Sequence, residues 1–307
     1  MRVAVTGGTG FVGRNLAGRL RRDTVVVSRR TGVAIDDVDA LAESFRGCDA
    51  VAHCAGINRE IGGQTFQSVH VDGTKAVIEA ARRAGVKRIV MLSFLRARPD
   101  CGSGYHESKW AAEELVRASG LEYTIIKAGM IYGPGDHMVD HVTRAVRTWP
   151  IFATVGFRER TVRPVPVQEA VKVLLAALQG RLPDATVALT GAEELELGTA
   201  VRRIAKVADR RPLFVPVPVW VIHVLAQTTE WLMVVPLVAK AQARMLAEGV
   251  SVPAPYASEL PDELKPSLMF DEERIRAALP DGKFGPEDLR LVRWLGSKRH
   301  TPCACRR

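Results

Sequence analysis

A tyrosine and a lysine with three residues between them are the side chains best suited to chemistry in this sequence. Tyr105 and Lys109 lie four positions apart, so on a helix both project from one face. A tyrosine phenol titrates near about 10, and a neighbouring ammonium favours the phenolate and lowers that pKa toward a useful range. The pair therefore predicts proton transfer at a carbonyl or an alcohol. Tyr105 would transfer the proton, and Lys109 would adjust the pKa of Tyr105.

A glycine-rich segment near the N-terminus is suited to binding a dinucleotide. It follows an apolar run ending at Val5 and precedes a helical pattern. In such a turn Gly7 allows the tight bend, Gly10 admits a pyrophosphate, and Gly13 lets helix and strand pack closely. A purely structural glycine turn is the alternative. We expect the cofactor to contact Gly7, Thr9, Gly10, Phe11, Val12 and Gly13.

The residues after the second apolar run bear on which dinucleotide binds. An NAD site usually places a carboxylate here against the ribose 2′-hydroxyl, but this chain has Ser28, Arg29 and Arg30. A guanidinium can bind a 2′-phosphate through charge-assisted hydrogen bonds. We therefore predict NADP(H) as the cofactor and keep NAD as the alternative, in which both arginines are only solvated.

The pattern of apolar runs predicts the fold that positions these residues. Runs end at Val5, Val27, Cys54, Leu92 and Ile126, with helical patterns between them. This alternation predicts an α/β, doubly wound parallel-sheet Rossmann fold. We expect residues 1–190 to form the NAD(P)-binding domain, with 130–162 contributing to the substrate lobe. Residues 191–307 should form a smaller, mostly helical C-terminal lobe with a basic tail.

Several of these segments together resemble a known family. The resemblance rests on segments 6–13, 51–56, 71–74, 105–109 and 132–136. The first 190 residues resemble the extended or atypical short-chain dehydrogenases/reductases, the NAD-dependent epimerase/dehydratase family. Segment 245–250 is similar to the branch related to the NDUFA9-type accessory subunit of respiratory complex I.

The resemblance implies two further sets of site residues. Lys109 would hold the nicotinamide ribose as well as tune the tyrosine. The turn after the third strand would also contact the cofactor, through Cys54, Ala55 and Gly56.

The chain departs from the family pattern where the substrate would bind. The family usually has Ser or Thr near the end of the strand before the tyrosine, and here Phe94 takes that position. Ser93 is our candidate to orient the substrate oxygen, with Ser103 as the alternative. His70 replaces a frequent Asn, and the pair Lys127-Ala128 replaces a frequent Arg-Pro pair. These departures bear on turnover rather than on cofactor binding.

Two functions follow from these observations. The first is an NAD(P)(H)-dependent oxidoreductase acting on a hydroxyl or carbonyl of a small-molecule substrate. The second is a non-catalytic NADPH-binding structural or redox-sensing subunit attached to a membrane or a partner complex. Tyr105 and Lys109 favour the enzyme, whereas Phe94 and the apolar second half favour the subunit.

An uncharged stretch in the second half raises the question of membrane contact. Residues 213–239 contain one charged residue, Glu230. The uncharged part 213–229 is shorter than the roughly 20 residues that span a bilayer, and it contains Pro216 and Pro218. We rank buried lobe helices ahead of a membrane-surface or protein-complex contact. The expected location is cytoplasmic, with a peripheral place at the inner membrane face as the alternative.

Charge and cysteine content exclude other classes. Lys and Arg number 43 against 34 Asp and Glu, but part of this excess lies in the tail after residue 297. No basic stripe alternates with aromatics, so we expect no nucleic-acid partner. Five cysteines, an odd number, predict reduced thiols. His137 and His141 have metal-ligand spacing on a helix, but the family chemistry needs no metal and we predict none.

Overall fold

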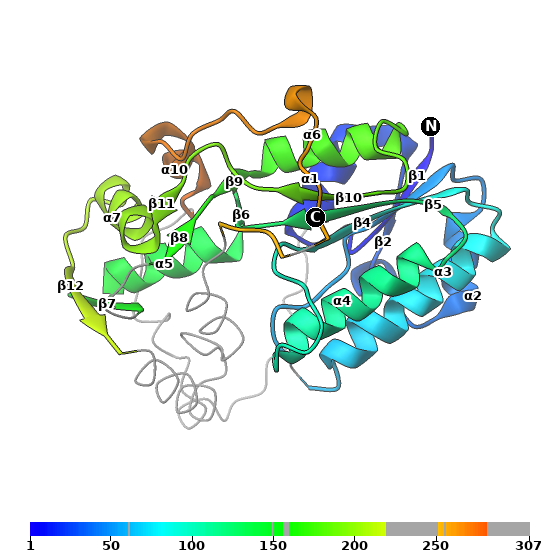
Figure 1. Ribbon diagram of the computed structural model, residues 1–307, viewed down its shortest axis with the longest axis horizontal. Helices are drawn as coiled ribbons and strands as arrows, with labels where there is room; N and C mark the ends of the chain where they lie inside the picture. Colours follow the sequence, from blue (N-terminus) through cyan, green and yellow to red (C-terminus); the bar gives the residue numbers. More distant parts are fainter. Residues whose placement is uncertain (61, 149, 156–159, 219–250, 255, 281–307) are drawn as a thin grey trace, which may run out of the picture.

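A single parallel sheet forms the centre of the molecule (Figure 1). The computed structural model describes residues 1–60, 62–148, 150–155, 160–218, 251–254 and 256–280. Six parallel strands are ordered β2-β1-β3-β4-β5-β10 across the sheet. They are β1 (Val3–Thr6), β2 (Thr24–Val27), β3 (Ala50–His53), β4 (Arg88–Phe94), β5 (Glu122–Ala128) and β10 (Ala185–Leu189).

Helices cover both faces of this sheet, as Figure 1 shows. One face carries α1 (Phe11–Leu20) and α6 (Val167–Leu178), which pack on each other. The other carries α2 (Val38–Phe45), α3 (Gly73–Arg83) and α4 (Gly104–Arg117). Strands β1 and β3 are buried throughout, and their side chains alternate between two apolar clusters, one on each face. Burial on both faces explains the continuous apolar runs, and the predicted doubly wound Rossmann fold is confirmed.

Short helical turns connect these elements. Two 3₁₀ turns flank β2, η1 (Arg21–Asp23) and η2 (Arg29–Thr31). A π-helical segment, η3 (Gln67–Asp72), runs directly into α3. A further 3₁₀ turn, η4 (Asp262–Leu264), lies near the C-terminal end of the described chain.

A second apolar core forms beside the sheet from later residues (Figure 1). Its helices are α5 (His137–Thr148), α7 (Leu197–Val207) and α10 (Glu272–Ala278). Short paired strands join it: β6 (Ile131–Tyr132) with β9 (Val165–Pro166), β7 (Ile151–Val155) with β12 (Leu213–Val217), and β8 (Thr161–Val162) with β11 (Leu195–Glu196). Tyr132, Ile204, Phe270 and Ile275 are buried together at its centre.

The chain after residue 250 contacts both parts of the molecule. Ser258 bonds with β10, donating its backbone N–H to the Thr186 carbonyl. Leu260 and Leu264 are buried in the cluster beneath α6. Farther along, α10 packs on α7. Residues 251–280 therefore tie the second core back onto the Rossmann sheet.

The uncharged stretch begins as a strand. Leu213–Val217 forms β12, so our expectation of helix is wrong for these five residues. Leu213 is exposed, and residues 219–239 lie outside the described part of the chain. The basic tail, with Cys303 and Cys305, lies outside it as well. Within the described residues, no helix combines the length and apolar character that crossing a membrane requires.

Candidate active site

The glycine turn after β1 is held by close backbone contacts. Gly7 has a left-handed backbone (φ +66°), and a Cβ there would lie 2.7 Å from the backbone of Ala55. A Cβ on Gly13 would overlap the Gly7 carbonyl oxygen. The predicted roles of Gly7 in the bend and of Gly13 in close packing are therefore confirmed.

The N-terminus of α1 lies at the point where the strand order reverses. The chain passes from β1 to β2 on one side and from β3 to β4 on the other. Ligands of doubly wound folds bind in the crevice at such a point. Gly10 is the residue before α1, and a Cβ on it would meet only the Gly7 carbonyl within 4 Å. Thr9, Phe11 and Val12, which complete the predicted phosphate-binding turn, are half-buried at this end of α1.

Two arginines are presented beyond the end of β2. Ser28 and Thr31 brace this turn, since each backbone N–H donates to the other's hydroxyl (2.9 and 3.3 Å). Arg29 and Arg30 project from the turn and are exposed. Neither guanidinium forms a hydrogen bond or ion pair with any described residue, so both are available to an anion.

The end of β3 lies against the glycine turn. The Cys54 N–H donates to the Thr6 carbonyl oxygen (3.1 Å), and Ala55 contacts Gly7. Burial raises the pKa of the Cys54 thiol to about 12, so this group is a neutral thiol at physiological pH. The structure thus brings together two sequence segments that we predicted to contact the cofactor.

Helix α4 carries the tyrosine and lysine, and both are buried. The Lys109 ammonium donates to the Leu92 carbonyl oxygen (3.4 Å) and lies against Gly56, where a Cβ would be 3.0 Å from Nζ. Burial lowers the pKa of Lys109 to about 8, and the Glu113 carboxylate opposes that shift. Lys109 and Gly56 therefore meet at the predicted cofactor crevice.

Aromatic rings surround Tyr105. Phe66, His70, Phe94 and His106 present edges or faces to it, with ring centroids 5.3–5.9 Å away. Burial raises the pKa of the phenol above its usual range. Our expectation that the ammonium lowers this pKa is wrong for this structure, because burial disfavours the charged phenolate and raises the pKa.

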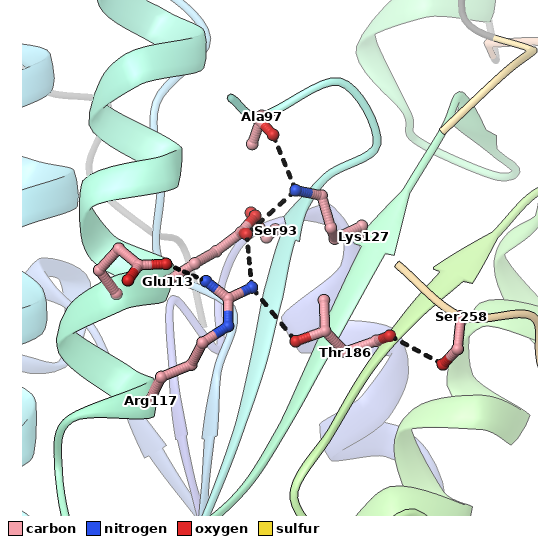
Figure 2. A network of polar contacts seen from close by, with 8 residues as sticks. Ser93, Ala97, Glu113, Arg117, Lys127, Thr186 and Ser258 are labelled. Carbon is pink, nitrogen blue, oxygen red and sulfur yellow. Dashed lines mark hydrogen bonds and ion pairs between the residues drawn. The ribbon is translucent and has the colours of Figure 1, made fainter. Parts of the chain in front are cut away.

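The strand before α4 places its serine away from the tyrosine. Ser93 and Phe94 alternate across β4, so they point to opposite faces. The Ser93 hydroxyl donates to Glu113 Oε1 (2.5 Å), as Figure 2 shows, while the Phe94 ring packs on Tyr105. Ser103, the alternative hydroxyl, is hydrogen-bonded to His106 Nδ1 (2.6 Å). Ser93 as the residue that orients a substrate oxygen stays a prediction.

Two buried histidines connect neighbouring elements beside the crevice. His53 lies between the hydroxyls of Thr6 (2.7 Å) and Thr74 (3.0 Å). His70 Nε2 accepts from the Ile57 N–H (3.1 Å). Burial lowers the pKa of His53 to about 3 and of His70 to about 2, so both rings are neutral.

The neutral His70 ring reaches the tyrosine's own helix. Its Nδ1 bonds with Ser108 Oγ (2.9 Å), and the Ser108 hydroxyl donates to the Tyr105 carbonyl oxygen (3.0 Å). In the sequence His70 stands out only as a departure from the family pattern, because its partner Ser108 lies 38 residues away and no local pattern indicates this bond.

Two carboxylates beside the histidines with metal-ligand spacing have structural partners. Asp136 accepts hydrogen bonds from the N–H groups of Gly133 (2.9 Å) and Val139 (2.7 Å) and thereby caps the start of α5. Asp140 forms an ion pair with Arg144 (2.8 Å). These contacts give both carboxylates a structural role.

Comparisons with known proteins agree with this geometry. Residues 7–146 match a family model described as NAD(P)H-binding. The ceramide reductase of Caulobacter vibrioides is 32% identical over 191 residues, covering 57% of this chain and 60% of that protein. The chain thus spans about three fifths of this relative's length.

Two further proteins are similar over more of the chain. The mouse (Mus musculus) mitochondrial NADH dehydrogenase [ubiquinone] 1 alpha subcomplex subunit 9 is 27% identical over 243 residues, covering 71% of this chain and 64% of that protein. A nucleoside-diphosphate-sugar epimerase from Staphylococcus aureus has the same fold, with a TM-score of 0.68 at 12% identity, covering 90% of this chain and 99% of that one. The family model and these relatives support the predicted membership of the extended short-chain dehydrogenases/reductases, the NAD-dependent epimerase/dehydratase family.

Proposed function

We propose that this protein is an NAD(P)H-dependent oxidoreductase that reduces a carbonyl group or oxidises the corresponding alcohol. One observation carries the proposal: α4 brings Lys109 against Gly56 at the crevice and holds Tyr105 one helical turn away. The nicotinamide, when bound, supplies or accepts the hydride. Lys109 would hold its ribose through the ammonium, which needs no rearrangement to face the crevice.

The state of Tyr105 favours one direction of reaction. Burial raises the pKa of its phenol, so the side chain is a neutral O–H donor at physiological pH. A neutral phenol can give a proton to the oxygen of a carbonyl as that oxygen gains negative charge. We therefore propose carbonyl reduction as the principal direction.

We propose NADP(H) as the preferred cofactor. The support is the pair Arg29 and Arg30, both exposed after β2 and both without a partner among the described residues. A 2′-phosphate would give these cations a charge-assisted contact that the 2′-hydroxyl of NAD cannot.

An apolar carbonyl compound is the substrate class that the surroundings of Tyr105 favour. Phe94, Leu95 and Ala97 are buried in one cluster with Tyr105, and Phe66 packs against it. A hydrophobic wall favours apolar substrate over sugar, because sugar hydroxyls would lose hydrogen bonds to water there. The similarity to a ceramide reductase points the same way.

A substrate panel tests this proposal. Oxidation of NADPH would be followed by absorbance with long-chain ketones and aldehydes, with short polar carbonyl compounds and with nucleotide sugars. We expect turnover of the long-chain compounds, strongly reduced in a Tyr105→Phe variant. Preference for nucleotide sugars would overturn the apolar substrate, and turnover unaffected by Tyr105→Phe would overturn the assigned chemistry.

A second candidate function rests on Phe94. This ring packs on Tyr105 where family enzymes usually present a hydroxyl, and the Ser93 hydroxyl is engaged by Glu113. Such a site suits a non-catalytic NADPH-binding subunit, as does the similarity to a subunit of NADH dehydrogenase. Residues 213–239 would then contact a membrane surface or a partner complex.

Vesicle binding separates the second candidate from the first. Full-length protein would be sedimented with anionic vesicles at low and high salt. The subunit function predicts binding that salt weakens but does not abolish, since apolar insertion is not screened. It also predicts no turnover across the panel. Turnover together with no vesicle binding would remove this candidate.

A further inference from the structure

A buried carboxylate lies one helical turn beyond Lys109. Glu113 is fully buried, and both its oxygens accept hydrogen bonds (Figure 2). Oε1 accepts from the Ser93 hydroxyl (2.5 Å). Oε2 accepts from the Lys127 ammonium (3.0 Å) and from the Arg117 guanidinium (3.1 Å). A carboxylate with three donors is well compensated for its loss of water.

These bonds fasten α4 to the sheet. Ser93 lies on β4 and Lys127 on β5, so one side chain of α4 reaches two neighbouring strands. Arg117 extends the network to Thr186 Oγ1 on β10 (3.2 Å). Lys127 also donates to the Ala97 carbonyl oxygen (2.7 Å) in the loop that leads to α4. The network therefore sets how α4 lies over three strands, and with it where Tyr105 lies.

The carboxylate also acts on the charge of Lys109. Glu113 follows Lys109 by four residues, so both occupy the buried face of α4. Burial favours a neutral amine at Lys109, and Glu113 is the main influence that opposes it.

We propose that Glu113 is a positioning residue for the cofactor lysine. It seats α4 against the sheet and keeps Lys109 as an ammonium while the surrounding apolar crevice favours the amine. This role rests on the proposed function, in which the Lys109 ammonium holds the nicotinamide ribose. A purely structural ion pair would fasten α4 equally well but would leave the titration of Lys109 unchanged.

The titration of Lys109 can be observed because the other titratable groups that face it do not change protonation state near neutral pH. Lys109 is faced by His53 on β3, by Cys54 directly after β3 and by His70 on η3, and their pKa values are about 3, 12 and 2, respectively. Tyr105, on its own helix, has a pKa raised by burial. Lys109, with a pKa of about 8, is therefore the group in this set that changes charge between pH 7 and 9.

The experiment is the pH dependence of NADPH affinity, measured by fluorescence titration of the full chain. The ammonium binds the ribose, so affinity should be full below the pKa of Lys109 and fall as pH rises through about 8. In Glu113→Gln this midpoint should move down by about one pH unit, because an attractive negative charge is lost. Lys109→Met should remove this midpoint, which would identify Lys109 as the group that titrates.

A neighbouring residue provides the matched control. Glu114 also forms an ion pair with Arg117 (2.5 Å), but it is half exposed rather than buried. Glu114→Gln removes the same charge from the next position of α4. Its midpoint should equal that of the unmodified protein, since exposed charges are screened.

A second variant keeps the test valid if Glu113→Gln does not fold. Glu113→Gln alone leaves the Lys127 ammonium buried without its carboxylate. Glu113→Gln with Lys127→Met removes both charges, and its midpoint should again lie below that of the unmodified protein, because the carboxylate that opposes the effect of burial on Lys109 is absent. Thermal unfolding reports whether each variant is folded.

Two outcomes would overturn the proposal, and they differ in what else they overturn. A folded variant without Glu113 that keeps the original midpoint makes the network purely structural and leaves the proposed function intact. A Lys109→Met variant that keeps the original pH profile overturns both, because Lys109 then does not hold the cofactor.

Discussion

The two ends of the crevice are built in different ways. At the dinucleotide end, the turn from Gly7 to Gly13 closes within seven residues and is fixed by backbone contacts. At the tyrosine end, the rings around Tyr105 come from residues 66 and 70 at η3, from residue 94 on β4 and from residue 106 on α4 itself. Changes at the first end should therefore affect cofactor binding, and changes at the second should affect chemistry.

The largest expected effect separates the two ends directly. Tyr105→Phe should lower turnover by about 10²–10⁴-fold, because a positioned proton donor is lost. NADPH affinity should stay nearly unchanged, since the cofactor end is intact. Steady-state kinetics with a substrate from the panel and a fluorescence titration measure both quantities.

Tyr123→Phe is the control, because Tyr123 lies on β5 in the apolar cluster beneath α2–α4. It removes the same hydroxyl away from the crevice and should leave turnover unchanged. A Tyr105→Phe variant that lost NADPH affinity as well would show that the two ends are not independent.

The next largest expected effect is a pH dependence of stability, caused by the two buried histidines beside the crevice. His53 and His70 have pKa values of about 3 and 2, below the usual value because both are buried. Below about pH 6.5 the unfolded chain binds two protons that the folded chain does not, so stability falls as pH falls. Between pH 7 and 5 this amounts to about 4 kcal/mol for both groups.

Urea denaturation at the two pH values measures this loss. His70→Asn removes one titrating ring, so the variant should lose about half of the pH dependence, or about 2 kcal/mol. The same pH dependence in the variant as in the unmodified protein would contradict a neutral, buried His70.

The histidines also show where sequence analysis stops. The alternating apolar runs predicted the doubly wound sheet, because strands buried on both faces leave a local signature. The glycine turn and the Tyr105–Lys109 spacing are local as well. By contrast, His53 meets Thr74, and Glu113 meets Lys127, in contacts between a strand and a helix that the sequence pattern does not predict. Such partners depend on strand order, which no local pattern encodes.

The same reasoning explains the two expectations that failed. The pKa of Tyr105 depends on burial by rings from distant segments, whereas the sequence shows only the nearby ammonium. Leu213–Val217 is uncharged in sequence, but it pairs with β7, about sixty residues earlier, and becomes a strand. In both cases, contact with a distant segment of the chain determined the property that the local sequence did not predict.

Substitution of two glycines in α1 should give smaller changes in the free energy of unfolding, with opposite signs. Gly13→Ala should lower the free energy of unfolding by about 1–3 kcal/mol, because the new methyl group overlaps the Gly7 carbonyl. It should also weaken NADPH binding. Gly18, five residues later in the same helix, is exposed, with no atom within 4 Å of its Cβ position.

Gly18→Ala is therefore the matched control. It should raise the free energy of unfolding by about 0.5–1 kcal/mol, because alanine favours helix over glycine. Urea denaturation of both variants checks the signs. Equal effects of the two substitutions would contradict the close approach of Gly13 to the turn.

The smallest expected effect concerns the choice of dinucleotide. Arg29 and Arg30 are exposed, so water and salt weaken any contact they make with a 2′-phosphate. We expect Arg29→Gln to cost about 1–2 kcal/mol of NADPH affinity, roughly 5–30-fold, and to leave NADH affinity unchanged. Calorimetry with both dinucleotides at low and high salt measures this, and the NADPH preference should shrink as salt rises.

Arg22→Gln is the control for the loss of one positive charge. Arg22 is an exposed arginine at the opposite end of β2, and its substitution should alter neither affinity. If the unmodified protein binds both dinucleotides equally, the arginines do not select the cofactor. The dinucleotide end then recognises only the pyrophosphate that NADPH and NADH share.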